Sequence, residues 1–294
     1  MPPLAPTHAV PVGEGRVVAL DDVGDPRGVP VVYLHGTPDS RLARHPDDGI
    51  AADRGVRLLA VDRPGYGGTS PLPRDAWPAA LAGALTHLGV ARCGVLAWSG
   101  GTLDALGLAL GAPGRVSSLG IVGGLVPAEA YDDPDVRAAA PDRADIVDLA
   151  AGLPPGRVGE MVAPMLAPHP CDLAVAAEHQ AEHRDPFDAA ELATVPGGSE
   201  RMAAALVEAV RPGLAGVAAD VEAQARPSGL DLGAIACPAR LWYGTRDPVA
   251  PPELGAWLAR RIPGAHLEVV EGAGHHLLMT RWGEILSALA EGRA

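Results

Sequence analysis

The sequence predicts an α/β fold, in which a doubly wound, mostly parallel sheet carries an inserted helical lid. Short apolar runs that end at Gly- and Pro-bearing loops alternate with helical spacing up to Gly124, as expected of buried parallel strands joined by helices. The sequence then becomes helical and rich in Ala, Asp and Pro, and the alternation resumes at Ala239. We therefore expect a first core half (1–125), a helical lid (126–229) and a second core half (230–294).

The first core half is expected to open with two short antiparallel strands, 9–12 and 16–21, joined by Gly13-Glu14-Gly15. The apolar runs that follow predict four parallel strands, at 28–34, 56–61, 94–97 and 119–122. Helical spacing between these runs predicts helices at 40–54, 77–88 and 102–110. Strands and helices that alternate in this order predict a doubly wound sheet with right-handed crossovers.

The predicted lid and the second core half continue this order. Helical patches in the lid predict helices at 143–151, 171–184 and 199–210. The second core half is expected to contain a strand at 239–243, a helix at 252–261, a strand at 266–270 and a last helix at 277–290.

The charge and composition of the chain exclude several classes of function. Its 36 acidic and 23 basic residues give a net charge of −13, which argues against a nucleic-acid footprint. All 23 basic residues are Arg. Without Lys, the chain cannot form a Schiff base, link pyridoxal phosphate or build a Walker-A phosphate loop.

Most of the negative charge lies in the predicted lid. Residues 126–229 hold 18 acidic residues and 7 Arg, so −11 of the net charge belongs to this segment. One interpretation is that an exposed helical cap carries charge for solubility. The other is that the charge repels anionic substrates from the entrance of the site. The sequence leaves both interpretations open.

The expected location of the protein is the cytoplasm. The N-terminal segment 1–6 has no basic region followed by an apolar one, and no apolar run reaches the roughly 18 residues of a membrane span. The three cysteines, Cys93, Cys171 and Cys237, are odd in number and widely spaced, so we expect reduced thiols rather than disulfides.

The strongest indication of chemistry is the segment Leu96-Ala97-Trp98-Ser99-Gly100-Gly101. It ends a predicted strand and opens a predicted helix. It resembles the nucleophile elbow of the α/β-hydrolase family, G-x-S-x-G, with Ala97 in place of the first glycine. The resemblance implies that Ser99 is the nucleophile. The alternative is an ordinary helix start with Ser99 as its N-cap.

A serine nucleophile needs a base to take its proton and an acid to orient that base. In the family, the acid and then the histidine follow the serine along the chain. The loop Tyr243-Gly244-Thr245-Arg246-Asp247 follows an apolar strand, and Gly272-Ala273-Gly274-His275-His276 follows the last one; both resemble family loops. The resemblance therefore implies His275 as general base and Asp247 as the orienting acid.

Two other residues compete for these roles. His276 adjoins His275, but the family pattern places the catalytic imidazole directly after the second glycine, so His276 is expected to pack at the next helix start. Asp104, on the helix after Ser99, is expected to be a buried structural partner. Some relatives carry the acid after the strand that ends near residue 122, where this chain has Gly123-Gly124-Leu125.

The resemblance also implies an oxyanion hole, in which two N–H groups stabilise the tetrahedral intermediate. One donor is the backbone N–H of Gly100. The other is that of Thr37, in His35-Gly36-Thr37-Pro38, which resembles the family's H-G-x-P loop, where the proline is often cis. His35 is expected to hold this loop. Trp98 is expected to line the acyl pocket, with packing beneath the lid as the alternative.

A second pattern points to different chemistry. His179-Gln180-Ala181-Glu182-His183 matches the H-x-x-E-H motif of a class of zinc peptidases. Such a site also needs a third ligand and a catalytic scaffold, and this segment lies in the charged lid. We therefore expect no metal.

The resemblance covers residues 15–125 and 230–292 and implies a serine hydrolase that cleaves a small-molecule carboxylic ester through an acyl-enzyme on Ser99. It implies no cofactor, a small-molecule substrate, and neither nucleic acid nor membrane as a partner; the oligomeric state stays open. Because a fold does not fix a function, a cyclase, lyase or thioesterase on the same scaffold is the alternative. A third possibility, a non-catalytic ligand receptor, is disfavoured by the intact set of catalytic residues.

Overall fold

The computed structural model describes residues 5–291 and contains an eight-stranded sheet of order β1-β2-β4-β3-β5-β6-β7-β8. β1 pairs antiparallel with β2 and β2 with β4, whereas all other neighbours are parallel. The predicted fold class is therefore confirmed. Residues 1–4 and 292–294 of the expected core halves lie outside the described residues. The strands are β1 (His8–Pro11), β2 (Val17–Gly24), β3 (Val29–Leu34), β4 (Val56–Val61), β5 (Cys93–Trp98), β6 (Val116–Val122), β7 (Ala239–Gly244) and β8 (His266–Val270).

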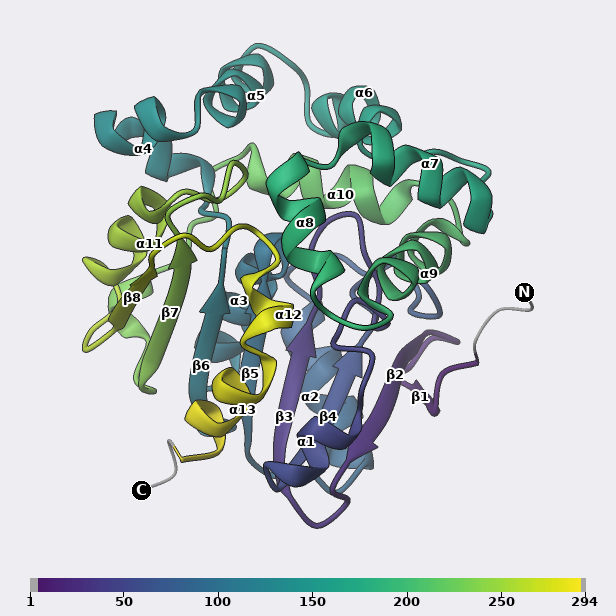
Figure 1. Ribbon diagram of the computed structural model, residues 1–294. Helices are drawn as coiled ribbons and strands as arrows, with labels where there is room; N and C mark the ends of the chain where they lie inside the picture. Colours follow the sequence, from purple (N-terminus) through teal and green to yellow (C-terminus); the bar gives the residue numbers. More distant parts are fainter. Residues whose placement is uncertain (1–4, 292–294) are drawn as a thin grey trace.

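Helices cover both faces of the sheet (Figure 1). Apolar side chains of α2 (Trp77–His87), α3 (Thr102–Gly111) and α11 (Pro252–Ala259) share one buried cluster with one face of the strands. Those of α1 (Gly49–Asp53), α12 (Leu277–Thr280) and α13 (Trp282–Glu291) share a second cluster with the other face. The strands between these layers are buried on both sides, which explains their continuous apolar runs.

The parallel strands place the candidate site at one edge of the sheet. All six residues of the central strand β5 are buried. Since β3, β5, β6, β7 and β8 run in the same direction, the loops that follow them meet at their carboxyl ends. These loops hold Thr37, Ser99, Gly123, Asp247 and His275.

The segment between β6 and β7 is helical and lies across this edge of the sheet (Figure 1). We call residues 126–229 the inserted segment. The expected helices at 143–151, 171–184 and 199–210 correspond to α5, α7 and α9, whereas α4, α6, α8 and α10 were not predicted. The elements are η2 (Ala128–Asp132), α4 (Pro134–Ala139), α5 (Pro141–Ala151), α6 (Arg157–Leu166), α7 (Leu173–His183), α8 (Pro186–Ala193), α9 (Gly198–Val210) and α10 (Ala215–Gln224), followed by η3 (Leu232–Ala234).

Two predicted helices were wrong in extent. Of the helix expected at 40–54, only α1 forms, because Arg41 and Arg44 are buried in ion pairs with Asp21 and Asp62 and the chain before α1 follows those contacts. The helix expected at 277–290 is broken at Arg281 into α12 and α13.

None of the helices in residues 5–291 is by itself long and apolar enough to span a membrane. The pair α9 and α10 passes the test of length and composition only together, with a bend of 95° between them.

Candidate active site

Ser99 lies in a strained turn between β5 and α3. Its φ of +52° is in the left-handed region, which residues other than glycine rarely adopt. Two glycines let neighbouring groups approach this turn: a Cβ on Gly101 would lie 2.4 Å from the backbone carbonyl oxygen of Leu34, and one on Gly100 would lie 2.2 Å from the side-chain oxygen Oγ1 of Thr37. Ala97 is a buried residue within β5, where its methyl group is accommodated.

Asp247 and His275 are joined by a hydrogen bond of 2.7 Å between Asp247 Oδ2 and His275 Nδ1. The other carboxylate oxygen, Oδ1, accepts hydrogen bonds of 2.8 Å from the backbone N–H groups of Val249 and Ala250. A Cβ on Gly123 would lie 3.0 Å from Asp247 Oδ2 and 3.2 Å from His275 Nδ1. The glycine after β6 therefore leaves the space that the pair occupies.

The electrostatic surroundings of His275 keep it basic. Burial alone would lower the pKa of this imidazole, but the charge and hydrogen bond of Asp247 outweigh burial and raise the pKa above its ordinary value. Because Asp247 engages Nδ1, the nitrogen that can exchange a proton with a substrate or nucleophile is Nε2.

Trp98 connects the strand that carries Ser99 to the loop that carries His275. Its indole Nε1 donates a hydrogen bond of 3.1 Å to the carbonyl oxygen of His275, and the two rings lie 5.3 Å apart. The Trp98 ring also lies 5.7 Å from the ring of His276. Burial and Arg184 lower the pKa of His276 well below its usual value. Trp98 is thus packed between β5 and the histidine loop.

Two acidic residues of α8 hold the histidine loop, and sequence reasoning missed both. Asp188 Oδ1 accepts a hydrogen bond of 2.7 Å from the backbone N–H of His275, and Glu191 Oε1 accepts one of 3.3 Å from Gly274. In the sequence they were two of many acidic residues in the inserted segment, with no motif to single them out.

The loop after β3 is held by a buried network that reaches α10. The peptide bond between Thr37 and Pro38 is cis. Thr37 Oγ1 donates a hydrogen bond of 2.5 Å to Asp220 Oδ2, which also accepts 2.6 Å and 2.7 Å bonds from Arg63 and Tyr66. Burial would raise the pKa of Asp220, but Arg63 outweighs it and lowers the pKa, so this carboxylate is charged. Within residues 5–291, the backbone N–H of Thr37 has no hydrogen-bond partner.

His35 and Asp39 flank the same loop. His35 Nε2 accepts a hydrogen bond of 3.0 Å from the backbone N–H of Arg63, and its Nδ1 lies 2.8 Å from the carbonyl oxygen of Gly36. Asp39 is buried, and burial raises its pKa to about 7, against the opposing effect of Arg184. A Cβ on Gly36 would lie 3.2 Å from Ser99 Cβ and 3.4 Å from Asp39 Oδ2, so Gly36 lies between Ser99 and this carboxyl group, which sequence reasoning missed.

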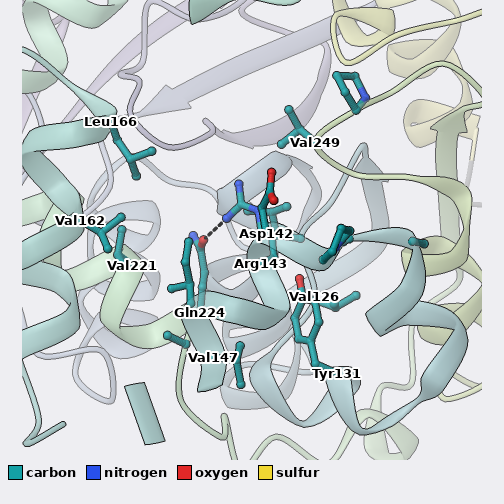
Figure 2. A pocket seen from close by; sticks show the side chains of 17 residues that line it. Val126, Tyr131, Asp142, Arg143, Val147, Val162, Leu166, Val221, Gln224 and Val249 are labelled. Atoms are coloured by element: carbon teal, nitrogen blue, oxygen red, sulfur yellow. Dashed lines mark hydrogen bonds between the residues drawn. The ribbon is translucent and has the colours of Figure 1, made fainter. Parts of the chain in front are cut away.

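A cavity of about 280 Å³ lies between the inserted segment and this edge of the sheet (Figure 2). Its wall includes Leu125, whose N–H donates to the carbonyl oxygen of Ser99, and Pro248 and Val249, which follow Asp247. Gln224 also lines it and donates a 3.5 Å hydrogen bond to Thr37 Oγ1. Trp98 does not contribute to the lining of this cavity. The cavity therefore borders the loops that carry Ser99, Asp247 and Thr37.

The remaining candidates from the sequence lie elsewhere. Asp104 is buried in ion pairs with Arg63 and Arg74. His179 and His183 stack on each other at 4.3 Å, and each has a ring nitrogen within hydrogen-bonding distance of a backbone carbonyl oxygen. Residues 5–291 contain no group of three or more His, Cys, Asp or Glu side chains that could hold a metal ion.

Comparisons with known proteins identify the family of the chain. A family profile described as the alpha/beta hydrolase fold matches residues 29–281. The pimeloyl-[acyl-carrier protein] methyl ester esterase of Neisseria meningitidis serogroup B is 29% identical over 221 residues, which are 74% of this chain and 75% of that protein. The protein of the same name from Chromobacterium violaceum is 41% identical over 59 residues, 20% of this chain and 23% of that protein. Among solved structures, an alpha/beta hydrolase fold protein from Nakamurella multipartita is 26% identical, with coverage of 96% and 99% and a TM-score of 0.65.

Proposed function

The chain belongs to the α/β hydrolase fold family of hydrolases, and from that premise we propose that it cleaves a small-molecule carboxylic ester through an acyl-enzyme on Ser99. Two observations carry the proposal: the 2.7 Å hydrogen bond between Asp247 and His275, and the φ of +52° at Ser99 in the turn after β5. The name of the curated relatives, a methyl ester esterase, supports an ester as the bond that is cleaved.

In the first half-reaction, Ser99 Oγ attacks the ester carbonyl carbon while His275 Nε2 takes the hydroxyl proton. The carbonyl oxygen becomes an oxyanion, and the backbone N–H groups of Thr37 and Gly100 donate hydrogen bonds to it. The backbone N–H of Thr37, which has no hydrogen-bond partner among the residues that the structure describes, supports this role. The intermediate then collapses, the ester C–O bond breaks, and His275 returns the proton to the leaving alcohol.

In the second half-reaction, water replaces the alcohol. His275 Nε2 takes a proton from the water as its oxygen attacks the acyl carbon, and the same two N–H groups stabilise the second oxyanion. Collapse breaks the bond to Ser99 Oγ, which regains its proton from His275, and the acid leaves. Asp247 stabilises the imidazolium in both halves, and no metal or organic cofactor takes part.

We assign the inserted segment the role of a lid. It lies over the edge of the sheet that carries Ser99, and its helices line the 280 Å³ cavity (Figures 1 and 2). This volume is at the small end of ligand pockets, which span roughly 300 to 1,000 Å³. The proposed substrate is therefore a small ester, whose reacting bond lies below the lid.

A fluorophosphonate probe tests the nucleophile, and a panel of esters and thioesters tests the reaction. The probe is expected to label Ser99, to leave a Ser99→Ala variant unlabelled, and to abolish ester hydrolysis as it reacts. Absence of labelling in a protein that still hydrolyses esters would remove Ser99 from the mechanism. Labelling of Ser99 without ester turnover, but with turnover of thioesters, would replace the proposed reaction by the thioesterase alternative.

A further inference from the structure

One cation faces the cavity without a carboxylate partner. Arg143, on α5, is half-buried and lines the cavity wall. Within residues 5–291, no carboxylate oxygen lies within 4.0 Å of its guanidinium nitrogens, whereas Arg137, Arg157, Arg211 and Arg226 of the same inserted segment form ion pairs. Arg184 and Arg201 of this segment also form no ion pair among the described residues, but neither lines the cavity.

The surroundings of Arg143 are mostly apolar. Val126, Val147, Val162 and Val221 are among the side chains around the cavity (Figure 2). Burial lowers the pKa of the guanidinium, and Tyr131 and Asp247 oppose that effect. An arginine remains charged at neutral pH in such a site, so its charge favours an anionic partner.

The nearby acidic groups do not satisfy this charge. Asp142 also lines the cavity, but it is exposed and forms no ion pair with Arg143. Asp247 is engaged by His275 and by two backbone N–H groups. Among the described residues, the one side-chain hydrogen bond that Arg143 makes is to the neutral amide of Gln224, at 3.2 Å to Oε1 (Figure 2).

Gln224 connects Arg143 to the reaction site. While its Oε1 accepts from Arg143, its Nε2 donates to Thr37 Oγ1 at 3.5 Å and lies 2.9 Å from the position of a Cβ on Gly100. One amide group thus separates the guanidinium from the loop and the glycine assigned to the oxyanion. Arg143 and Thr37 therefore contact the two ends of the same amide, and both Gln224 and Arg143 line the cavity.

We propose that the substrate of this site is an ester that also carries a free carboxylate, and that Arg143 binds the carboxylate at the far side of the cavity. The planar guanidinium offers two parallel N–H donors, a geometry that matches a carboxylate. The apolar wall then takes the carbon chain between the carboxylate and the ester. This inference rests on the proposed ester hydrolysis and specifies its substrate class.

Two pairs of esters of equal length test the inference. Monoethyl glutarate against ethyl pentanoate places the carboxylate on the acyl arm, and 4-acetoxybutyrate against butyl acetate places it on the alcohol arm. We expect kcat/KM to favour the carboxylate ester by roughly tenfold or more in one pair, as a charge-assisted hydrogen bond would provide. A preference for the neutral ester in both pairs overturns the inference and leaves the ester hydrolase intact, whereas no turnover of any ester overturns the proposed function.

Variants assign the preference to Arg143. Arg143→Met is expected to remove the preference for the carboxylate ester while keeping turnover of its neutral partner, which also shows that the variant is folded. Arg143→Lys keeps the charge but not the paired donors, and is expected to retain part of the preference. Arg157→Met, which removes an exposed arginine of the same inserted segment, is the matched control and is expected to behave as wild type.

Calorimetry provides a readout without catalysis. The Ser99→Ala protein is titrated with monoethyl glutarate and with 4-acetoxybutyrate, which it cannot turn over. We expect one of the two to bind, and to bind at least about tenfold more weakly when Arg143→Met is added. Equal binding with and without Arg143 would show that the carboxylate is held elsewhere or not at all, and would overturn the inference even if ester hydrolysis is established.

Discussion

At the scale of single residues, two neighbouring histidines differ in the hydrogen-bond partner of their Nδ1. His275 has Asp247 on Nδ1, whereas His276 is buried and its Nδ1 has no partner within the described part of the chain. We therefore expect His275→Ala to lower kcat for a neutral ester by at least about 10³-fold, and His276→Ala to keep most of the activity. Steady-state kinetics of both folded variants checks this, and the reverse ranking would contradict the assigned base.

The pH profile follows from the same hydrogen bond. His275 can accept the proton of Ser99 only when its imidazole is neutral, so kcat/KM is expected to rise with pH through the pKa of this residue. Since the net effect of burial and Asp247 is to raise that pKa, the midpoint is expected above the ordinary value of about 6.5. In Asp247→Asn, the rate should fall and the midpoint should move to lower pH. A flat profile from about pH 5 to 9 would argue against an imidazole base.

A second titratable group, Asp39, is also expected to affect the pH profile. Its pKa is raised to about 7 and it interacts with His275, so its negative charge above that pH helps to keep His275 protonated. Asp39→Asn is expected to lower the midpoint without abolishing turnover. An unchanged midpoint would mean that Asp39 does not act on the base.

The residues that sequence reasoning proposed for the site and those that it did not single out differ in how they are placed. Ser99, Asp247 and His275 stand next to strand ends within short motifs, so their local sequence marks them. Asp188, Asp220 and Arg143 reach the site from helices of the inserted segment, across long stretches of chain. Their sequence surroundings are ordinary acidic and Ala-rich helix, so only the tertiary structure shows which of them face the site.

At the scale of elements, α10 supports the loop that carries the proposed oxyanion donor. Asp220 on this helix accepts hydrogen bonds from Thr37, Arg63 and Tyr66 and is buried. Asp220→Asn leaves the positive charge of Arg63 less compensated, and we expect the free energy of unfolding to fall by about 3 kcal/mol. We also expect kcat to fall roughly 10²-fold, because Thr37 loses its position.

Denaturant unfolding and kinetics on a neutral ester check both parts of this prediction. The matched control is Asp148→Asn on α5, since Asp148 forms an exposed ion pair with Arg137. That control is expected to change neither quantity. Full activity in a destabilised Asp220→Asn would show that α10 contributes to stability alone.

The accuracy of the sequence predictions also differs from one type of element to another. Buried parallel strands are continuous apolar runs bounded by turns, and β3, β4, β5, β7 and β8 lie where these runs predict them. Short helices of the inserted segment, such as α4 and α8, have only six and eight residues and no clear apolar stripe, so periodicity did not reveal them. The helix expected at 40–54 failed because buried ion pairs of Arg41 and Arg44 decide the path of the chain there.

At the scale of the whole molecule, the negative charge and the cavity act on a substrate in opposite directions. Of the net charge of −13, −11 belongs to the inserted segment, while Arg143 inside the cavity is a cation. The net charge is expected to slow the approach of an anionic ester, and salt screens this repulsion over roughly 8 to 10 Å. The half-buried Arg143 is screened less.

We therefore expect kcat/KM of an anionic ester to rise as salt increases from low ionic strength, while that of a neutral ester of equal length stays constant. Initial-rate kinetics at a series of salt concentrations checks this. A constant ratio between the two esters would mean that the acidic inserted segment only keeps the protein in solution.

The central claim is that ester hydrolysis passes through an acyl group on Ser99, and trapping that intermediate tests it most directly. The enzyme is mixed with p-nitrophenyl acetate, stopped with acid on the millisecond scale, and analysed by peptide mass spectrometry, with nitrophenol release followed in parallel. We expect a burst of nitrophenol equal to the enzyme concentration and an acetyl group on the peptide that contains Ser99. A burst of nitrophenol with no acetyl group on Ser99, or an acetyl group on another residue, would contradict the account.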